Sequence, residues 1–125
     1  MAHHRGDDSV LYHIDVDGTW NEVTTYMAIG SGSSVANTFC AELDHDNITI
    51  KEFTRRAYLA IKYMEHYCRG LGVGIESRGH PDIKYLFYDK EKDYNVSEDD
   101  IKEYKQYSEK KLELFKQSFD SILNE

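Results

Sequence analysis

The chain has 125 residues and a net charge of −8, with 40% hydrophobic and 13% aromatic residues. This length fits one domain, here taken as residues 1–125, and the composition is that of a folded chain with a sizeable core. The acidic balance excludes nucleic acid and anionic membrane surfaces as partners, and no apolar run approaches the roughly 20 residues that span a bilayer.

The first predicted element is a β-hairpin. Residues 1–9 contain no apolar signal core and are expected to form a flexible N-terminal segment. Val10, Tyr12 and Ile14 alternate with Leu11 and His13, and residues 19–29 are β-rich with two distinct faces, which predicts two strands. Asp15 and Asp17 resemble the start of a calcium loop, but the later ligands of that loop are missing. We therefore interpret both as turn residues.

The most informative stretch is a glycine junction within residues 26–36, where an apolar strand runs into Gly30-Ser31-Gly32. Glycines let the backbone turn tightly and let a ligand or another segment come close. A helix is predicted to begin at Ser33, and the free amides at a helix start can hold an oxygen atom or an anion. We expect such a backbone-amide site at Gly30, Gly32 and Ser33.

Two helices are predicted next. Apolar residues at helical spacing predict a helix over residues 33–43. Thr49 and Glu52 then form a capping box at the start of a longer helix. The small side chains of Ala57 and Ala60 on its apolar face would let a neighbouring element approach closely.

The last third of the chain is predicted to form a hairpin followed by a helix. Residues 72–76 are a predicted short strand, and alternation over residues 83–88 predicts its hairpin partner. Residues 89–93 are charged and are interpreted as a solvated link. Ser97 is the expected cap of a C-terminal helix over residues 97–124, with three acidic residues in its first turn.

Cysteine and histidine patterns indicate no metal site and no cofactor. Cys40 and Cys68 lie on separate predicted helices, outside any metal-ligand spacing. Buried free thiols and a reducing, cytoplasmic compartment are therefore expected. The polar cluster 44–47 is interpreted as an exposed loop. The histidines at positions 13, 45, 66 and 80 have no nucleophile at a triad spacing, so surface or packing roles are expected.

The order of these elements resembles the second half of a proteasome-type subunit, which has the N-terminal nucleophile (Ntn) hydrolase fold. The matching pieces lie within residues 10 to 88 and are Leu11–Gly18, Ala28–Ser33, Thr49–Tyr67 and Ile83–Tyr88. The resemblance implies an α+β fold that is part of a four-layer αββα sandwich, with antiparallel strands and about three helices.

The resemblance also bears on chemistry. In the family, a threonine at a free N-terminus is the nucleophile and its own amine is the base, which is a form of covalent peptide hydrolysis. Thr24 and Thr25 cannot replace it because their amines are tied into peptide bonds. Ser31 matches the family serine that hydrogen-bonds around the nucleophile's amine, which is a supporting role. The family's Asp, and its Ser before paired glycines, are absent from residues 69–74.

Three hypotheses follow. The first is a proteasome-like subunit or fragment without peptidase activity alone, which acts through assembly with itself or with other such subunits. The second is the C-terminal part of an active threonine peptidase whose nucleophile half is missing from this chain. The third is a small α+β protein that binds an anion. Half a sandwich would leave Ile29, Tyr85 and Phe87 uncovered, which predicts an oligomer or a partner chain.

Overall fold

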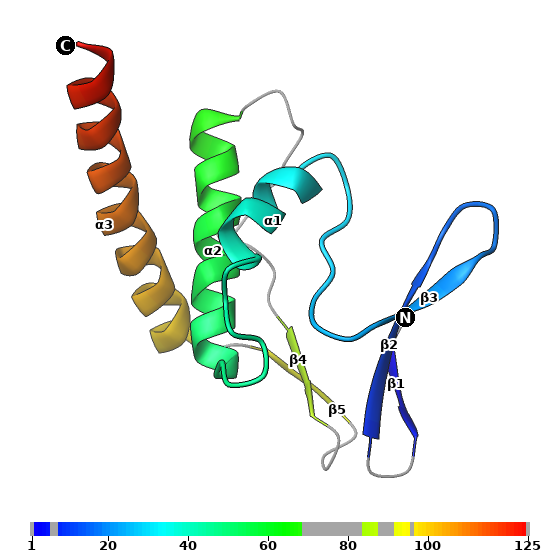
Figure 1. Ribbon diagram of the computed structural model, residues 1–125. Coiled ribbons are helices and arrows are strands. Elements are labelled where there is room, and N and C mark those ends of the chain that lie inside the picture. The colour runs from blue at the N-terminus through cyan, green and yellow to red at the C-terminus, as the bar shows by residue number, and fades with distance from the viewer. Residues whose placement is uncertain (1, 6–7, 69–83, 88–91, 96, 125) are drawn as a thin grey trace.

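The computed structural model describes residues 2–5, 8–68, 84–87, 92–95 and 97–124 (Figure 1). These residues include antiparallel strands and helices, so the expected α+β class is confirmed. The elements in chain order are β1 (Ala2–Arg5), β2 (Asp8–Ile14), β3 (Trp20–Val23), α1 (Ser33–Cys40), α2 (Ile50–Tyr67), β4 (Lys84–Phe87), β5 (Lys92–Asn95) and α3 (Glu98–Leu123).

The N-terminal sheet has β2 at its centre, with β1 and β3 antiparallel on its two sides. Leu11 is opposite Ala2 of β1 and Val23 of β3. The predicted hairpin is thus confirmed. The segment 1–9, expected to be flexible, instead contains β1 and the start of β2. Pairing with β2 satisfies main-chain groups whatever the side chains are, so a polar strand such as β1 carries little sequence signal.

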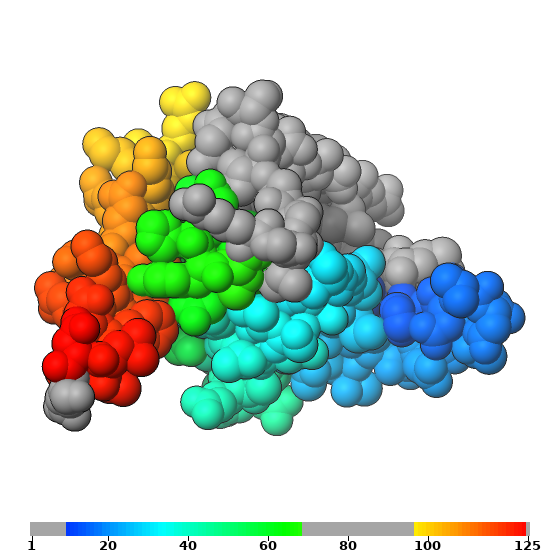
Figure 2. Space-filling model, turned by 90° about the horizontal axis from the view of Figure 1, so that it is seen from above, coloured from blue at the N-terminus to red at the C-terminus, as the bar shows by residue number. Residues whose placement is uncertain are grey.

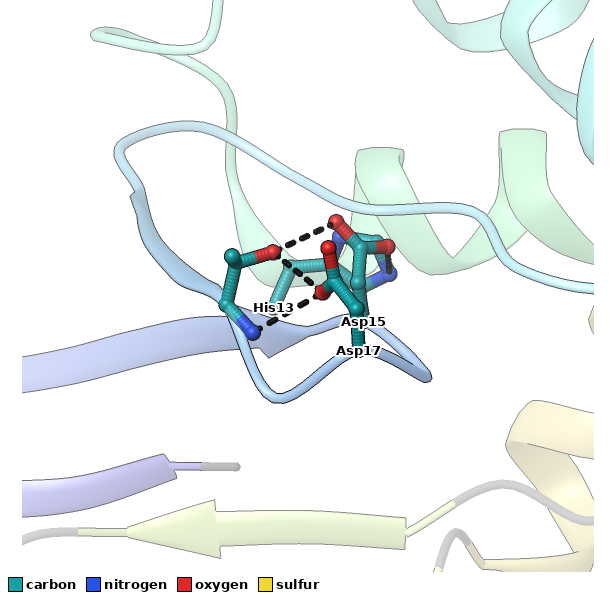
Figure 3. Close-up of polar contacts among 4 residues, drawn as sticks. His13, Asp15 and Asp17 are labelled. Atoms are coloured by element: carbon teal, nitrogen blue, oxygen red, sulfur yellow. Dashed lines mark hydrogen bonds and ion pairs between the residues drawn. The ribbon is translucent and has the colours of Figure 1, made fainter.

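A hydrogen-bonded turn joins β2 to β3, and Figure 3 shows His13, Asp15 and Asp17 grouped there. The amide of Asp15 donates to the carbonyl of Thr19 at 2.8 Å, and the hydroxyl of Thr19 donates to Asp17 Oδ1 at 2.7 Å. Hydrogen bonds from the side chain and main chain of Thr19 lower the pKa of Asp17. Gly18 has a φ of 86°, a conformation that glycine adopts without strain. These contacts support our interpretation of the two aspartates as turn residues.

The strand predicted over residues 19–29 ends at Val23, and residues 24–29 run as irregular chain. The cause is tertiary packing around Tyr26. Its ring stacks on His45 with centroids 4.9 Å apart and lies 5.8 Å from the ring of Phe53 on α2. Burial of this ring draws the segment out of the sheet and onto the helices.

Local capping explains where the two longer helices begin. Thr49 Oγ1 accepts from the amide of Glu52 at 3.1 Å, and Glu52 Oε2 accepts from the amide of Thr49 at 3.3 Å, so the predicted capping box is present. Ser97 Oγ accepts from the amide of Asp100 at 3.2 Å at the start of α3. The acidic first turn of α3 suits the positive end of the helix.

The three helices form one layer, with α2 between α1 and α3 (Figure 1). The N-terminal sheet lies at the opposite end of the molecule, as the view from above also shows (Figure 2). Most of the core lies in the helical layer, and Val10 of β2 is buried as well. The buried residues of the helical layer are Cys40, Thr54, Tyr58, Leu59, Ala60, Met64, Tyr104 and Ser108.

The second pair of strands differs from the prediction. β4 pairs with β5 in an antiparallel register that sets Lys84 opposite Asn95 and Phe87 opposite Lys92. Part of the expected solvated link, at residues 92–93, is therefore strand. The charged side chains of this segment do not show the alternation that predicts a strand. The hydrogen bonds between paired strands use only main-chain groups and so form whatever the side chains are. The strand expected over residues 72–76 lies outside the described residues.

Candidate functional site

The glycine junction turns sharply before α1. Gly30 has a φ of 97°, in the left-handed region where a side chain is strained. Its carbonyl accepts from the amide of Ser33 at 3.1 Å, and the carbonyl of Gly32 accepts from the amide of Ala36 at 3.0 Å. The junction is therefore a closed turn that leads directly into the helix, as its sequence predicts.

The start of α1 presents main-chain amides. Its N-cap is Gly32, and no side chain caps it by a hydrogen bond. The amides of Ser34 and Val35 lie in the first turn, where a helix has no carbonyl to accept them. Ser31 and Ser34 are exposed beside them. This arrangement has the donors that an oxygen atom or anion requires.

The junction faces α2 across a cavity of about 430 Å³. One wall is the chain from Tyr26 to Ser33, which includes all four candidate residues at positions 30–33. The other wall is apolar and consists of Ala36, Cys40, Phe53, Ala57, Ala60, Ile61 and Met64. The small residues predicted to allow close approach, Ala57 and Ala60, lie in this wall.

Cys40 is the only cysteine among the residues that line this cavity in the described structure, and it does not suit catalysis. It is 3% exposed, and burial raises the pKa of its thiol, an effect that the nearby Arg56 partly offsets. A raised pKa keeps the sulfur protonated and therefore weakly nucleophilic near neutral pH. Desolvation, with a further contribution from Cys40, also raises the pKa of Tyr26.

His13, His45 and His66 lie beside a turn, in an aromatic cluster and on the surface of a helix, respectively. The ring of His45 stacks on Tyr26 and also contacts Phe53, and its Nε2 is 3.1 Å from the carbonyl oxygen of Cys40. His13 Nε2 is 3.7 Å from Asp15 Oδ1 in the hairpin turn. His66 is exposed on α2 and contacts Tyr67. These surroundings support packing and surface roles, whereas His80 lies outside the described residues.

The polar loop after α1 is held by its own hydrogen bonds. Asp44 accepts from the side-chain amide of Asn47 at 2.7 Å and from the main-chain amide of Asp46 at 3.3 Å. The bond from Asn47 lowers the pKa of Asp44. No group of three or more His, Cys, Asp or Glu side chains is placed to hold a metal ion in the described part of the chain. Nor is any helix of that part long and apolar enough to cross a membrane.

The strands, the glycine junction and the helices form an α+β fold in which the junction faces the apolar side of α2 across a cavity. A family model described as "Proteasome subunit" matches residues 2–76, which is more than half of the chain. The chain belongs to the proteasome subunit family. The resemblance drawn from sequence is thereby confirmed, and the match also includes residues 2–9. No curated protein and no solved structure matched in the corresponding searches.

Two contacts at the site could not be predicted from any local sequence pattern. Arg56 Nη1 donates to the carbonyl oxygen of Phe39 at 3.1 Å and so ties α2 to the end of α1. The stack of Tyr26 on His45 joins segments far apart in the sequence. Both contacts position the junction, and both depend on packing between elements rather than on any spacing within one.

Proposed function

We propose that this chain is a proteasome-type subunit that acts by assembly with itself or with related subunits and that has no peptidase activity alone. Family membership over residues 2–76 is the observation that carries this proposal. Subunits of such a class depend on contacts between chains, and the elements described here are part of a larger layered fold.

Exposed apolar side chains support assembly. Trp20 is 64% exposed on β3 and Ile29 is 74% exposed beside the glycine junction, and Ile14 and Met27 are exposed on the same part of the chain. Within the described strands, β1 and β3 each pair with β2 alone. Uncovered apolar side chains and unpaired strand edges are the usual marks of a surface that another chain covers.

The residues that match the family support the absence of peptidase activity in the chain alone. The family's Asp, and its Ser before paired glycines, have no counterpart at residues 69–74 of this sequence. Ser31 is proposed to have the supporting role that the family resemblance implies, and Gly30, Gly32 and Ser33 are proposed to form a backbone-amide site for an oxygen atom or an anion. Both cysteines are free thiols, which supports a reducing, cytoplasmic setting.

Sedimentation velocity at micromolar concentration tests the assembly. The wild-type chain should sediment as an oligomer, and Ile29→Glu should shift it toward monomer because a charge is costly in an apolar interface. Asn37→Glu, at an exposed position of α1, adds the same charge and should leave the oligomer intact. A wild-type chain that remains monomeric, alone and when mixed with a proteasome-type subunit, would overturn the proposal.

Fluorogenic peptide substrates test the proposal that the chain alone has no peptidase activity. The chain alone should release no fluorophore, and turnover by the purified chain alone would contradict us. The peptidase alternative predicts turnover only after a chain with an N-terminal threonine is added. The anion-binding alternative instead predicts that phosphate raises the melting temperature through the amides of Ser34 and Val35 in the first turn of α1, and that Gly30→Ala weakens this effect.

A further inference from the structure

We propose that the groove between α1, α2 and α3 binds a small amphiphile with an apolar body and one carboxylate head, such as a medium-chain fatty acid. The groove has a volume of about 650 Å³ and lies apart from the cavity at the glycine junction. Ligand pockets of proteins commonly have volumes of 300–1,000 Å³. Its lining residues come from all three helices.

The body of the ligand would lie against aromatic rings. Phe39 of α1 is 5.0 Å from Tyr63 of α2 and 6.1 Å from Phe115 of α3, measured between ring centroids. Tyr63 is 5.8 Å from Phe115, and Phe119 extends the row along α3. All four side chains are half-buried, so each keeps a face open to the groove. A surface of this kind gains from an apolar occupant.

The head of the ligand would meet cations. Arg56 and Lys111 line the groove, and Lys111 Nζ lies 5.6 Å from the ring centroid of Tyr107, another lining residue. The Cζ atom of Arg55 lies 4.5 Å from the same centroid. The ion pairs of the described residues are His13–Asp15, Lys51–Glu103 and Lys62–Glu65. Arg56 and Lys111, the two cations that line the groove, therefore have no carboxylate partner within this part of the chain, and Arg56 Nη1 donates to the main-chain carbonyl oxygen of Phe39.

Charge and shape together select the ligand class. A chain of net charge −8 offers many carboxylates, yet Lys111 lies beside the ring of Tyr107 and has no ion pair within the described residues. A small inorganic anion would pair with the cations and leave the aromatic surface wet. A neutral or cationic amphiphile would cover the rings and leave the cations unpaired or repelled. An amphiphile with an apolar body and an anionic head satisfies both halves of the groove, and a carboxylate is the head group that we propose.

The binding test uses decanoate as the probe, below its micelle concentration, in isothermal titration calorimetry with the full chain. Decanol and decyltrimethylammonium are the neutral and cationic controls of equal chain length. Decanoate should bind with a stoichiometry of one per chain and more tightly than either control. No binding of decanoate, or equal binding of the controls, would overturn the proposal.

Lys111→Glu and Lys110→Glu form a matched pair of variants. Lys110 is the exposed neighbour of Lys111, so both substitutions change the net charge equally, but only Lys111 lines the groove. Lys111→Glu should weaken decanoate binding about tenfold, the usual effect of losing one charge-assisted hydrogen bond. Lys110→Glu should bind as the wild type does. Equal affinity of all three proteins would place the ligand elsewhere and refute the site.

Cys68 provides a second readout that does not depend on calorimetry. It lines the groove and is half-buried, whereas Cys40 is buried in the other cavity. Decanoate should slow the alkylation of Cys68 by iodoacetamide several-fold, followed peptide by peptide with mass spectrometry. Unchanged alkylation of Cys68 at saturating decanoate would contradict the proposed position. Neither calorimetry nor alkylation depends on the oligomeric state. These experiments therefore test the ligand proposal independently of the assembly proposal.

Discussion

The guanidinium group of Arg56 donates a hydrogen bond of 3.1 Å to the main-chain carbonyl oxygen of Phe39, the penultimate residue of α1. Carbonyl groups in the last turn of a helix lack partners within the helix and carry partial negative charge. The bond therefore satisfies such a carbonyl and joins α1 to α2 at the same time. It also fixes one wall of each of the two cavities, because Cys40 and Phe39 line different ones.

We expect Arg56→Met to lower the free energy of unfolding by about 1.5 kcal/mol, because a hydrogen bond from a charged donor to a partly buried acceptor is lost. Methionine keeps most of the apolar volume of the side chain. Urea denaturation followed by circular dichroism measures the change. Lys105→Met, at an exposed position of α3, is the control and should stay near the wild-type value. Equal stability of Arg56→Met and wild type would show that the bond does not hold the helices together.

The glycine junction leads to a second prediction. Gly30→Ala should destabilise the fold by about 1–2 kcal/mol, because φ is 97° there and a left-handed conformation strains any residue with a β-carbon. An added Cβ would meet nothing within 4 Å, so the cost comes from the backbone alone. Gly30→Asn is the matched variant and should lose less, since asparagine tolerates this conformation. Thermal melts compare the two, and an equal loss for both would point to a steric cause instead.

Alkaline pH should weaken the fold. Burial raises the pKa of Cys40 above its ordinary value of 9.0, so the folded chain keeps this proton when the unfolded chain has released it. The folded state then binds more protons than the unfolded state, and stability falls as pH rises from about 9 toward the raised pKa. Below pH 9 the effect is absent.

Urea denaturation at a series of pH values measures this decline. Cys40→Ala removes the titrating thiol and should decline less steeply than the wild type just above pH 9. Tyr26 and Tyr63, whose pKa values are also raised by burial, should sustain the loss at higher pH in both proteins. Parallel curves for the two proteins would exclude Cys40 as the cause.

A fourth prediction concerns a buried hydroxyl. Ser108 is fully buried between α3 and α2, and its Oγ has no hydrogen-bond partner within the described residues. Ser108→Ala should therefore be neutral or raise the free energy of unfolding by up to about 1 kcal/mol. Ser118→Ala, at an exposed position of the same helix, shares the gain in helix propensity and serves as the control. A clear loss of stability in Ser108→Ala alone would reveal a partner for this hydroxyl.

Local rules were sufficient for several elements. The capping box of Thr49 and Glu52 and the cap at Ser97 each depend on residues three apart, so sequence alone locates the starts of α2 and α3. The turn after Ile14 and the tight junction at Gly30 depend likewise on neighbours and on glycine. The ordered series of these signals was enough to indicate the family that the residue 2–76 match then showed.

Tertiary packing decided the rest. Residues 24–29 have the composition of a strand, yet burial of the Tyr26 ring against His45 and Phe53 takes them out of the sheet. The polar strands β1 and β5 exist because a neighbouring strand offers main-chain partners, which no side-chain pattern reveals. The groove that holds Arg56 and Lys111 arises only where three helices meet. Sequence patterns reflect interactions between residues a few positions apart. These features depend instead on which distant segments pack against one another.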